Sequence, residues 1–333
     1  MKNVILLIGT GAISDLVYLP VLSSQEKWRS AVRCVDKDVG LGTAAAERHR
    51  VVFSGSDYKP LLQEAILAIV ATPPRSHYTI ARDCLECGVP VILEKPLTNT
   101  YSEGRQLVSL AEEKGLQLMV NNTRRLFQSY REINDIIRSG ELGEVRSIDY
   151  GEGGVFAWPT ASGFYFDAKG GGRGVLSDRG AHVLDLFCWW ANAELRLESC
   201  RTDEDGGVEG YCDVSMVLPR GKGRMRLSWH NKLSNRVEIQ CDRGILRTGI
   251  YDFREVSIQR SGRWEKRTLK GSERAFEDYG FTFARRAISA VLEGGSPPVS
   301  GGEVLGSLKL IDDCYERKER LKFPWLYRFG GKS

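Results

Sequence analysis

Apolar and polar residues alternate along the first third of the chain in the rhythm of strands followed by helices. Largely apolar runs of strand length cover residues 3–8, 31–35, 65–71, 89–93 and 116–120. The stretches between them have helical spacing and cover residues 14–25, 39–50, 76–87 and 101–114. Apolar strands of this kind are typical of a parallel sheet with helices on both faces. The pattern therefore predicts a doubly wound α/β domain over residues 1–121.

The pattern changes after residue 121. It continues with a helix over 125–139, a strand over 145–150, a loop rich in glycine and aromatic residues over 151–172, and a helix over 175–191. Runs that alternate with period two follow at 195–200, 211–218, 224–229 and 236–241, before helical stretches at 274–293 and 302–317. Such alternation is typical of an antiparallel sheet with one covered face. Residues 122–333 are therefore predicted to form an α+β domain with a large, mainly antiparallel sheet.

Composition narrows the class of protein. The chain has 333 residues, and its 47 basic and 43 acidic side chains leave a net charge of +4. A nucleic-acid-binding protein would show a dense basic face, which this balance disfavours. No apolar run reaches the length of a secretory signal or a membrane span, and the eight cysteines form no disulfide framework. We expect a cytoplasmic protein with free thiols, no membrane or nucleic-acid partner and no bound metal.

A glycine-rich turn follows the first predicted strand and opens a helix. Gly9 would allow the tight turn, and Gly11 would let the backbone approach a pyrophosphate. The helix N-terminus adds free N–H groups and the positive end of the helix dipole. The third glycine position of the usual motif is Ser14, which is small enough for close packing of helix on strand. The turn predicts a Rossmann dinucleotide site formed by Gly9, Thr10, Gly11, Ala12 and Ile13.

An acidic residue, Asp36, ends the second predicted strand. A carboxylate at this place accepts hydrogen bonds from the adenosine ribose and repels a 2′-phosphate, so it favours NAD over NADP. Asp36 could instead only cap the next helix. The neighbouring Arg33 and Lys37 could soften the discrimination against NADP. The sequence thus predicts NAD as cofactor, with NADP not excluded.

A proline-rich turn follows the strand over residues 65–71. Ligands of open α/β sheets lie outside the carboxyl ends of the strands, so Thr72 and Pro73 are expected to face the cofactor. The turn could equally be only a rigid loop. His77 begins the next helix, and packing near the cofactor is a simpler role for it than catalysis.

Three ionisable residues suit proton transfer. Lys95, within Glu94-Lys95-Pro96, stands at the carboxyl end of the strand over residues 89–93, in the ligand-facing place. Asp178 and His182 are spaced i, i+4 in a predicted helix, so they share one face. An Asp–His pair behind a glycine-rich entry is a plausible proton-handling unit. Taken singly, Lys95 could be a surface lysine and His182 a core histidine.

These motifs, in this order, resemble the Gfo/Idh/MocA family, which includes glucose–fructose oxidoreductase and inositol dehydrogenase. The resemblance covers nearly the whole chain. It rests on Gly9-x-Gly11, Ala71-Thr72-Pro73-Pro74 with His77, Glu94-Lys95-Pro96, and Gly171-Gly172 through Asp178 and His182. It implies an NAD-binding Rossmann domain followed by a substrate-binding and oligomerisation domain.

The resemblance also implies roles for single residues. Lys95 corresponds to the lysine that hydrogen-bonds the reacting oxygen and helps to relay its proton. His182 corresponds to the general acid/base, and Asp178 to the carboxylate that binds a neighbouring substrate hydroxyl. Glu94 and Lys95 also belong to the expected cofactor contacts. The implied reaction is hydride transfer between nicotinamide and a secondary alcohol or ketone of a sugar, cyclitol or sugar derivative.

Substrate contacts are predicted from position. Asn122 and Arg124 follow the last strand of the first domain. Trp158 lies in the aromatic loop, whose rings suit the apolar face of a sugar but could also pack on the sheet or on a second subunit. Arg173 lies in the glycine run before the Asp–His motif, and Arg179 directly follows Asp178, so the substrate could be anionic or nucleotide-linked.

Two other functions remain open. The protein could be a redox-neutral, NAD-using sugar-modifying enzyme, or a sensor that binds NAD and sugar without turnover, although Lys95, Asp178 and His182 are all retained. A homodimer or homotetramer is expected because the second face of the antiparallel sheet needs cover. Val214, Met216 and Leu218 are the alternating residues that we expect on that face.

Overall fold

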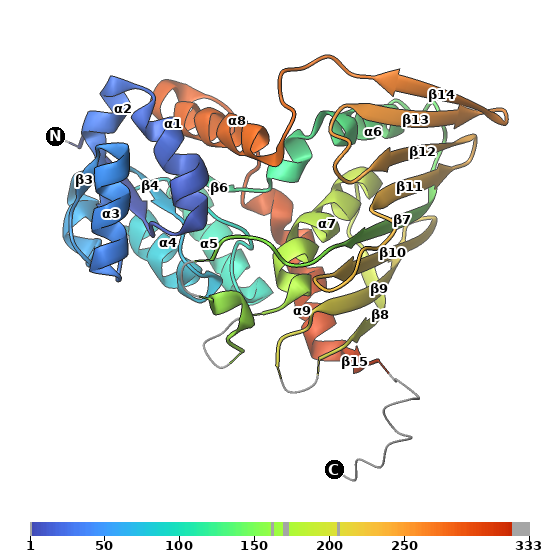
Figure 1. Cartoon of the computed structure of the whole chain (residues 1–333), viewed down its shortest axis with the longest axis horizontal. Helices are drawn as coiled ribbons and strands as arrows, with labels where there is room; N and C mark the ends of the chain where they lie inside the picture. The colour runs from blue at the N-terminus through green and yellow to red at the C-terminus, as the bar shows by residue number, and fades with distance from the viewer. Residues whose placement is uncertain (1, 161–162, 169–172, 205–206, 322–333) are drawn as a thin grey trace, which may run out of the picture.

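The computed structural model describes residues 2–160, 163–168, 173–204 and 207–321, and it is built on two sheets (Figure 1). The first sheet has six parallel strands in the order β3-β2-β1-β4-β5-β6. The strands are β1 (Val4–Ile8), β2 (Val32–Val35), β3 (Val52–Phe53), β4 (Ala65–Val70), β5 (Val91–Leu93) and β6 (Leu118–Val120). The predicted Rossmann sheet is confirmed, and the short β3 is the one strand in it that the apolar pattern did not indicate.

Three helices cover this sheet near their predicted positions: α3 (Val39–His49), α4 (His77–Glu86) and α5 (Tyr101–Glu113). The helix predicted over 14–25 is present but ends at Ser23, and its first part is not α-helical. The chain forms a π-helical turn η1 (Ser14–Tyr18), then α1 (Leu19–Ser23), and a separate α2 (Glu26–Ala31). Leu19 N–H donates to the Ser14 carbonyl five residues back. Pro20 lies in the first turn of α1, where the missing N–H of a proline is tolerated.

The second sheet has nine strands in the order β14-β13-β12-β11-β7-β10-β9-β8-β15. All pairs are antiparallel except β7 with β10 and β8 with β15, which confirms a mainly antiparallel sheet. The strands are β7 (Val145–Gly153), β8 (Arg196–Thr202), β9 (Tyr211–Leu218), β10 (Gly221–Ser228), β11 (Arg236–Cys241), β12 (Gly244–Gly249), β13 (Glu255–Arg260), β14 (Arg263–Thr268) and β15 (Glu319–Arg320).

The sequence pattern missed the far end of this sheet. β12, β13 and β14 were not predicted, because β14 is a charged, exposed edge strand and only Val256 and Ile258 mark the covered face of β13. β7 also runs to Gly153, so part of the loop predicted from residue 151 is strand. Gly171 and Gly172, at the end of that loop, lie outside the described residues.

Helices α7 (Val175–Ala191) and α9 (Leu305–Arg317) lie between the two sheets (Figure 1). Val214, Met216 and Leu218 are buried within this one chain, under α7, where Phe187 and Met216 both approach Gly223. The prediction that these three residues lie on the face that needs a partner is therefore wrong. The opposite face is polar and carries ion pairs between neighbouring strands, among them Arg224–Asp213 and Arg226–Asp149.

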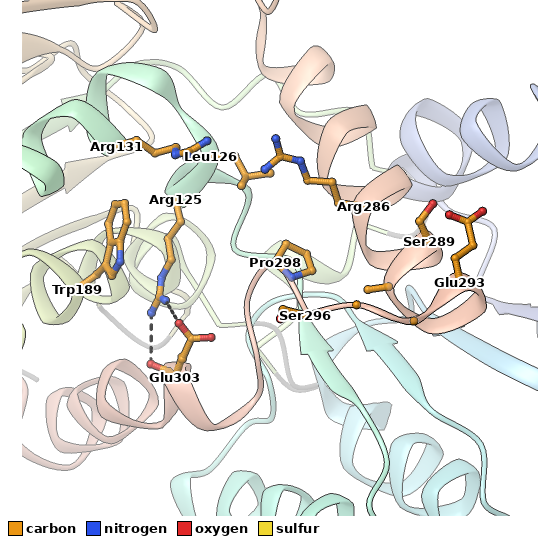
Figure 2. A pocket seen from close by; sticks show the side chains of 13 residues that line it. Arg125, Leu126, Arg131, Trp189, Arg286, Ser289, Glu293, Ser296, Pro298 and Glu303 are labelled. Atoms are coloured by element: carbon orange, nitrogen blue, oxygen red, sulfur yellow. Dashed lines mark hydrogen bonds and ion pairs between the residues drawn. The ribbon is translucent and has the colours of Figure 1, made fainter.

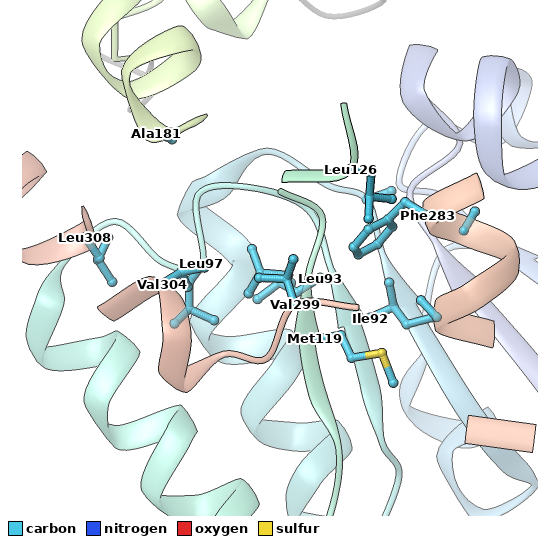
Figure 3. Close-up of a cluster of buried hydrophobic side chains, with 14 of the residues drawn as sticks. Ile92, Leu93, Leu97, Met119, Leu126, Ala181, Phe283, Val299, Val304 and Leu308 are labelled. Carbon is cyan, nitrogen blue, oxygen red and sulfur yellow. The ribbon is translucent and has the colours of Figure 1, made fainter. Parts of the chain in front are cut away.

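The C-terminal segments return to the first sheet. Helix α6 (Gln128–Arg138) follows the crossover from β6, and α8 (Phe276–Ser289) packs against η1, with Gly280 facing Val17. Buried side chains from both halves of the chain form one cluster there (Figure 3), which includes Ile92, Leu93, Met119, Phe283, Val299, Val304 and Leu308. This shared core fixes the first sheet relative to α7, which carries the predicted reacting groups. Within the described part of the chain, no helix is both long enough and apolar enough to cross a bilayer.

Candidate active site

A cleft of about 1280 Å³ lies at the carboxyl ends of β1, β4 and β5 and extends to α7 and the second sheet. Most predicted site residues line it: Gly9, Gly11, Ala12, Ile13, Asp36, Thr72, Pro73, Glu94, Lys95, Arg124, Trp158, Arg173, Asp178, Arg179 and His182. Three do not line it, namely Thr10, His77 and Asn122, and the chain neighbours Asn121 and Thr123 do so instead of Asn122. The tertiary structure thus brings residues from both predicted domains into one cavity.

The glycine turn depends on Gly9. Its φ of +92° is a conformation that side chains disfavour, and a Cβ there would lie 2.6 Å from the Ala71 carbonyl oxygen. Ser14 Oγ donates a 2.6 Å hydrogen bond to the Gly9 carbonyl and closes the turn. At Gly11, in contrast, a Cβ would have no other protein atom within 4 Å, so the open side of this glycine is left for a ligand. These features fit the pyrophosphate of a dinucleotide.

Thr10 supports the acidic residue that the sequence placed beside the ribose. Its backbone N–H and its Oγ1 donate to Asp36 Oδ2 over 2.7 and 2.8 Å. Asp36 Oδ1 accepts from Asp38 N–H, and Asp38 itself caps α3 by accepting from Leu41 N–H. The alternative that Asp36 is the cap of the next helix is therefore wrong, and its carboxylate is held at the edge of the cleft.

His77 is fully buried and joins two cleft-lining turns. Its Nδ1 lies 2.8 Å from the Pro96 carbonyl oxygen and its Nε2 2.8 Å from that of Thr72. Burial lowers the pKa of His77, although both carbonyl groups oppose that shift. His77 therefore braces the turns after β4 and β5 and does not face the cleft.

At the other end of the cleft, Lys95 and Asp178 form an ion pair. Lys95 Nζ donates to Asp178 Oδ1 over 2.6 Å and to the Asp178 carbonyl over 2.9 Å. An ammonium group has three donors, so one N–H of Lys95 remains for a ligand. The pair joins the end of β5 to α7, and it thereby brings the Glu94-Lys95-Pro96 motif next to the Asp–His motif.

His182 faces the same cavity with its imidazole almost fully buried. Burial, together with the positive charges of Lys95 and Arg124, lowers the pKa of His182 well below its usual value. Its Nδ1 has no hydrogen-bond partner among the described residues. A neutral imidazole of this kind can accept a proton at neutral pH.

A second ion pair, which the sequence did not reveal, lies beside this centre. Arg124 is buried and donates from Nη2 to Glu152 Oε1 over 3.0 Å and from Nη1 to Tyr150 Oη over 2.6 Å. Burial would raise the pKa of Glu152, but the Arg124 charge outweighs it and holds that pKa below the usual range. Ile148, Tyr150 and Glu152 lie at alternate positions of β7, on its covered face. A glutamate at a position where an apolar residue is expected was the signal in the sequence that could have indicated this ion pair.

The next residue, Arg125, points to a different cavity (Figure 2). Its Nε donates to Asp185 over 2.7 Å, its Nη1 donates to Glu303 over 2.8 Å, and its guanidinium lies 5.7 Å from the Trp189 ring. This second cleft, of about 490 Å³, shares no lining residue with the first. Asp185 is thus a structural partner of Arg125, and the residues predicted for proton transfer line the larger cleft.

Aromatic side chains form part of the wall of the larger cleft. Trp158 lines it and meets the Phe276 ring edge-on at 6.3 Å. Phe156 and Tyr165 of the same loop also line the cleft and pack against Trp229. The aromatic residues of this loop therefore pack against one another and also line the cavity. The described residues include no group of three or more His, Cys, Asp or Glu that could hold a metal ion.

Comparison with known proteins agrees with this architecture. The Gfo/Idh/MocA model for an oxidoreductase NAD-binding Rossmann fold matches residues 4–122, and the model of the C-terminal domain matches residues 130–247. The scyllo-inositol 2-dehydrogenase (NADP(+)) IolW of Bacillus subtilis is 25% identical over 288 residues, which are 75% of this chain and 76% of that protein. An uncharacterized oxidoreductase of Schizosaccharomyces pombe is 25% identical over 70% of this chain, but only 64% of its own length is matched.

Solved structures share the fold. The 3-ketoreductase KijD10 of Actinomadura kijaniata, in complex with NADP and TDP-benzene, superposes with a TM-score of 0.80 at 22% identity, over 97% of this chain and 100% of that one. An Agrobacterium radiobacter oxidoreductase with NAD+, L-tartaric acid and magnesium has a TM-score of 0.77 at 16% identity, over 95% and 96% of the two chains. At these identities the solved structures show the fold alone. With both family models matched in order, the chain belongs to the Gfo/Idh/MocA family of NAD(P)-dependent oxidoreductases.

Proposed function

We propose that the protein transfers a hydride between nicotinamide and a secondary alcohol or ketone of a sugar, cyclitol or sugar derivative. The observation that carries this proposal is the convergence of Lys95, Asp178 and a neutral His182 in the cavity that also holds the glycine turn. When bound, the nicotinamide supplies or accepts the hydride. The protein residues then have to bind the reacting oxygen and move its proton.

The proton transfers follow from the neutral imidazole of His182 and the N–H donors of Lys95. In the oxidation direction, neutral His182 takes the hydroxyl proton as general base. The free N–H of Lys95 donates to the reacting oxygen and stabilises its developing negative charge. Asp178 holds Lys95 in place through the 2.6 Å ion pair and offers its remaining acceptor capacity to a neighbouring hydroxyl. In the reduction direction the same groups return the proton.

For the cofactor we propose NAD in preference to NADP. Gly9, Gly11, Ala12, Ile13, Thr72, Pro73 and Glu94 line its part of the cleft, while Thr10 and His77 support it from behind. Asp36 is held by Thr10 at the edge where the adenosine ribose would lie, and its charge would repel a 2′-phosphate. The expected result of Asp36→Ala is a shift of about tenfold in kcat/KM toward NADP, which corresponds to about 1.4 kcal/mol. An unchanged cofactor ratio would contradict this role of Asp36.

An anionic group on the substrate would suit two arginines of the cleft. Arg173 donates to the Asn99 carbonyl over 2.8 Å and lies 4.5 Å from the Tyr315 ring, with no ion pair among the described residues. Arg179 donates to the Ser228 carbonyl over 2.9 Å and lies 3.7 Å from Glu152, which Arg124 already neutralises. Both arginines thus keep donors for a carboxylate or phosphate, and Trp158 offers a ring face to a sugar.

The test is a panel of inositols, sugars, uronic acids and nucleotide sugars, assayed with NAD and NADP by the absorbance of the reduced cofactor. Turnover that is lost in Lys95→Ala and His182→Ala, but kept in the surface control Lys266→Ala, is the expected result. Consumption of a sugar without net reduced cofactor would favour the redox-neutral alternative, and tight cofactor binding without any turnover would favour a sensor. Light scattering on the same sample tests the proposed homodimer or homotetramer.

A further inference from the structure

A triangle of buried hydrogen bonds lies behind the cofactor side of the reaction centre. Tyr18 Oη donates to Glu94 Oε1 over 2.8 Å, and Asn121 Nδ2 donates to the same oxygen over 2.7 Å. Asn121 Nδ2 also lies 3.2 Å from Tyr18 Oη. All three side chains are buried, while Glu94 still lines the cleft. One carboxylate oxygen is therefore fixed from behind by two donors.

The irregular turn η1 is what brings Tyr18 to this place. Tyr18 is the last residue of the π-helical turn that follows the glycine motif, and it is completely buried. An extra residue in a helical turn rotates the side chains that follow it, and such turns are frequent at functional sites. The Tyr18–Glu94 bond thus ties the turn for the pyrophosphate to the end of β5, where Lys95 stands.

The positively charged side chains near Glu94 are already paired with other carboxylates. Lys95 is paired with Asp178, and Arg124 is paired with Glu152. Glu94 makes no ion pair with any described residue, and its hydrogen-bond donors Tyr18 and Asn121 are neutral. Burial raises the pKa of Glu94 overall, and the bonds from Asn121 and Tyr18, with the nearby Lys95, oppose that rise. Loss of the Tyr18 bond would therefore disfavour the carboxylate further.

We propose that Tyr18 is a positioning residue that, together with Asn121, holds the Glu94 carboxylate as a fixed negative charge beside the nicotinamide half of the cofactor. The oxidised nicotinamide ring is a cation and the reduced ring is neutral, so a buried carboxylate stabilises the oxidised form selectively. Tyr18 therefore helps to set the ratio of the affinities for oxidised and reduced cofactor. This inference rests on the cofactor part of the proposed function and requires no substrate.

The experiment measures Kd for NAD+ and for NADH at one pH and ionic strength, by calorimetry and by NADH fluorescence. Tyr18→Phe removes only the hydroxyl, and it is expected to weaken NAD+ binding about two- to tenfold more than NADH binding. Glu94→Gln is expected to change the ratio in the same direction and by more. Tyr315→Phe is the matched control, because Tyr315 Oη donates to the buried Glu209 over the same 2.8 Å outside the cleft. It should leave the ratio unchanged.

A double variant completes the design. In the Glu94→Gln background, Tyr18→Phe should have no further effect on the ratio, since its action runs through the carboxylate. Equal weakening of both cofactor forms, no change in either, or a persistent effect of Tyr18→Phe without Glu94 would each overturn the proposal. If Tyr18→Phe does not fold, Glu94→Gln alone decides, because an unchanged ratio in that variant also overturns it. A missing sugar substrate affects none of these measurements.

Discussion

At the cofactor end of the cleft, where we propose that the dinucleotide binds, the turn is shaped mainly by the backbone. At the reaction end, where we propose that hydride transfer occurs, Lys95 and Asp178 are positioned by one another. The glycine turn is shaped by the φ of Gly9 and the contact with Ala71, and its first two N–H groups donate to the Val35 carbonyl and to Asp36. Lys95 and Asp178, in contrast, are held by their mutual ion pair across two elements 83 residues apart. Apart from Gly9, whose conformation requires a glycine, we therefore expect the turn to tolerate exchange of side chains better than the charge network does.

The largest expected effect is loss of the proton acceptor at the reaction end. His182→Ala should lower kcat by about 10²- to 10⁴-fold, because a positioned general base contributes that much. The affinity for NAD should change little, since the cofactor end is built separately. Steady-state kinetics and cofactor titration on the same sample check both statements. A loss of cofactor affinity as large as the loss of kcat would break the comparison between the two ends.

The second largest effect is expected on stability, when the Arg124–Glu152 ion pair is broken. Glu152→Ala leaves the buried Arg124 guanidinium with an uncompensated charge and should lower the free energy of unfolding by about 3–5 kcal/mol. Chemical denaturation measures this difference. The exposed pair Lys222–Glu198 provides the control, because Glu198→Ala should cost about 1 kcal/mol or less. Equal losses in the two variants would show that burial of the pair is not what matters.

Two glycines sharpen the comparison at the cofactor end. Gly9→Ala should cost about 1–3 kcal/mol of folding stability, because the residue needs a positive φ and its Cβ meets the Ala71 carbonyl. Gly11→Ala should leave the melting temperature unchanged, since the added Cβ would have no other protein atom within 4 Å. It should nevertheless weaken NAD binding, because the Cβ would contact the ligand. Thermal unfolding without and with NAD separates the two effects. A stability loss in Gly11→Ala would contradict the assignment of its open side to the cofactor.

The smallest effect concerns pH. The pKa of His182 is lowered in the folded state, so below the unfolded-state value near 6.5 the unfolded chain binds a proton that the folded chain does not. The free energy of unfolding should therefore fall as pH decreases below about 6.5, by at most about 1.4 kcal/mol per pH unit from this residue. His182→Gln should show a shallower fall between pH 6.5 and 5. Parallel curves for the two proteins would mean that His182 is not kept neutral by the fold.

Much of the cofactor end could be predicted because its signals are local. Gly9, Gly11 and Asp36 stand at fixed places relative to two apolar strands, and the structure places all three on the cleft. Thr10 and His77 were predicted as contacts but act from behind, because which side of a turn faces the ligand depends on packing. Position and spacing indicated Lys95, Asp178 and His182, and the resemblance to a known family implied their roles. The structure brings all three into one cavity.

The misses share a physical cause. Tyr18 was assigned to an ordinary helix, and Glu152 to the start of a loop, because their importance comes from partners that are distant along the chain. Val214, Met216 and Leu218 alternate as a covered face should, but the pattern cannot say whether a helix of the same chain or a second subunit covers them.

The sequence by itself determined the two kinds of sheet, the place of the dinucleotide turn and the residue types available for proton transfer. These follow from the period of apolar residues and from motifs that act within a few residues. Only the tertiary structure decided that Asn121 and not Asn122 faces the cleft, that Arg124 and Arg125 serve different cavities, and that Glu94 is held by Tyr18. Burial and long-range hydrogen bonds set the energies of these groups, and neither is encoded in local spacing.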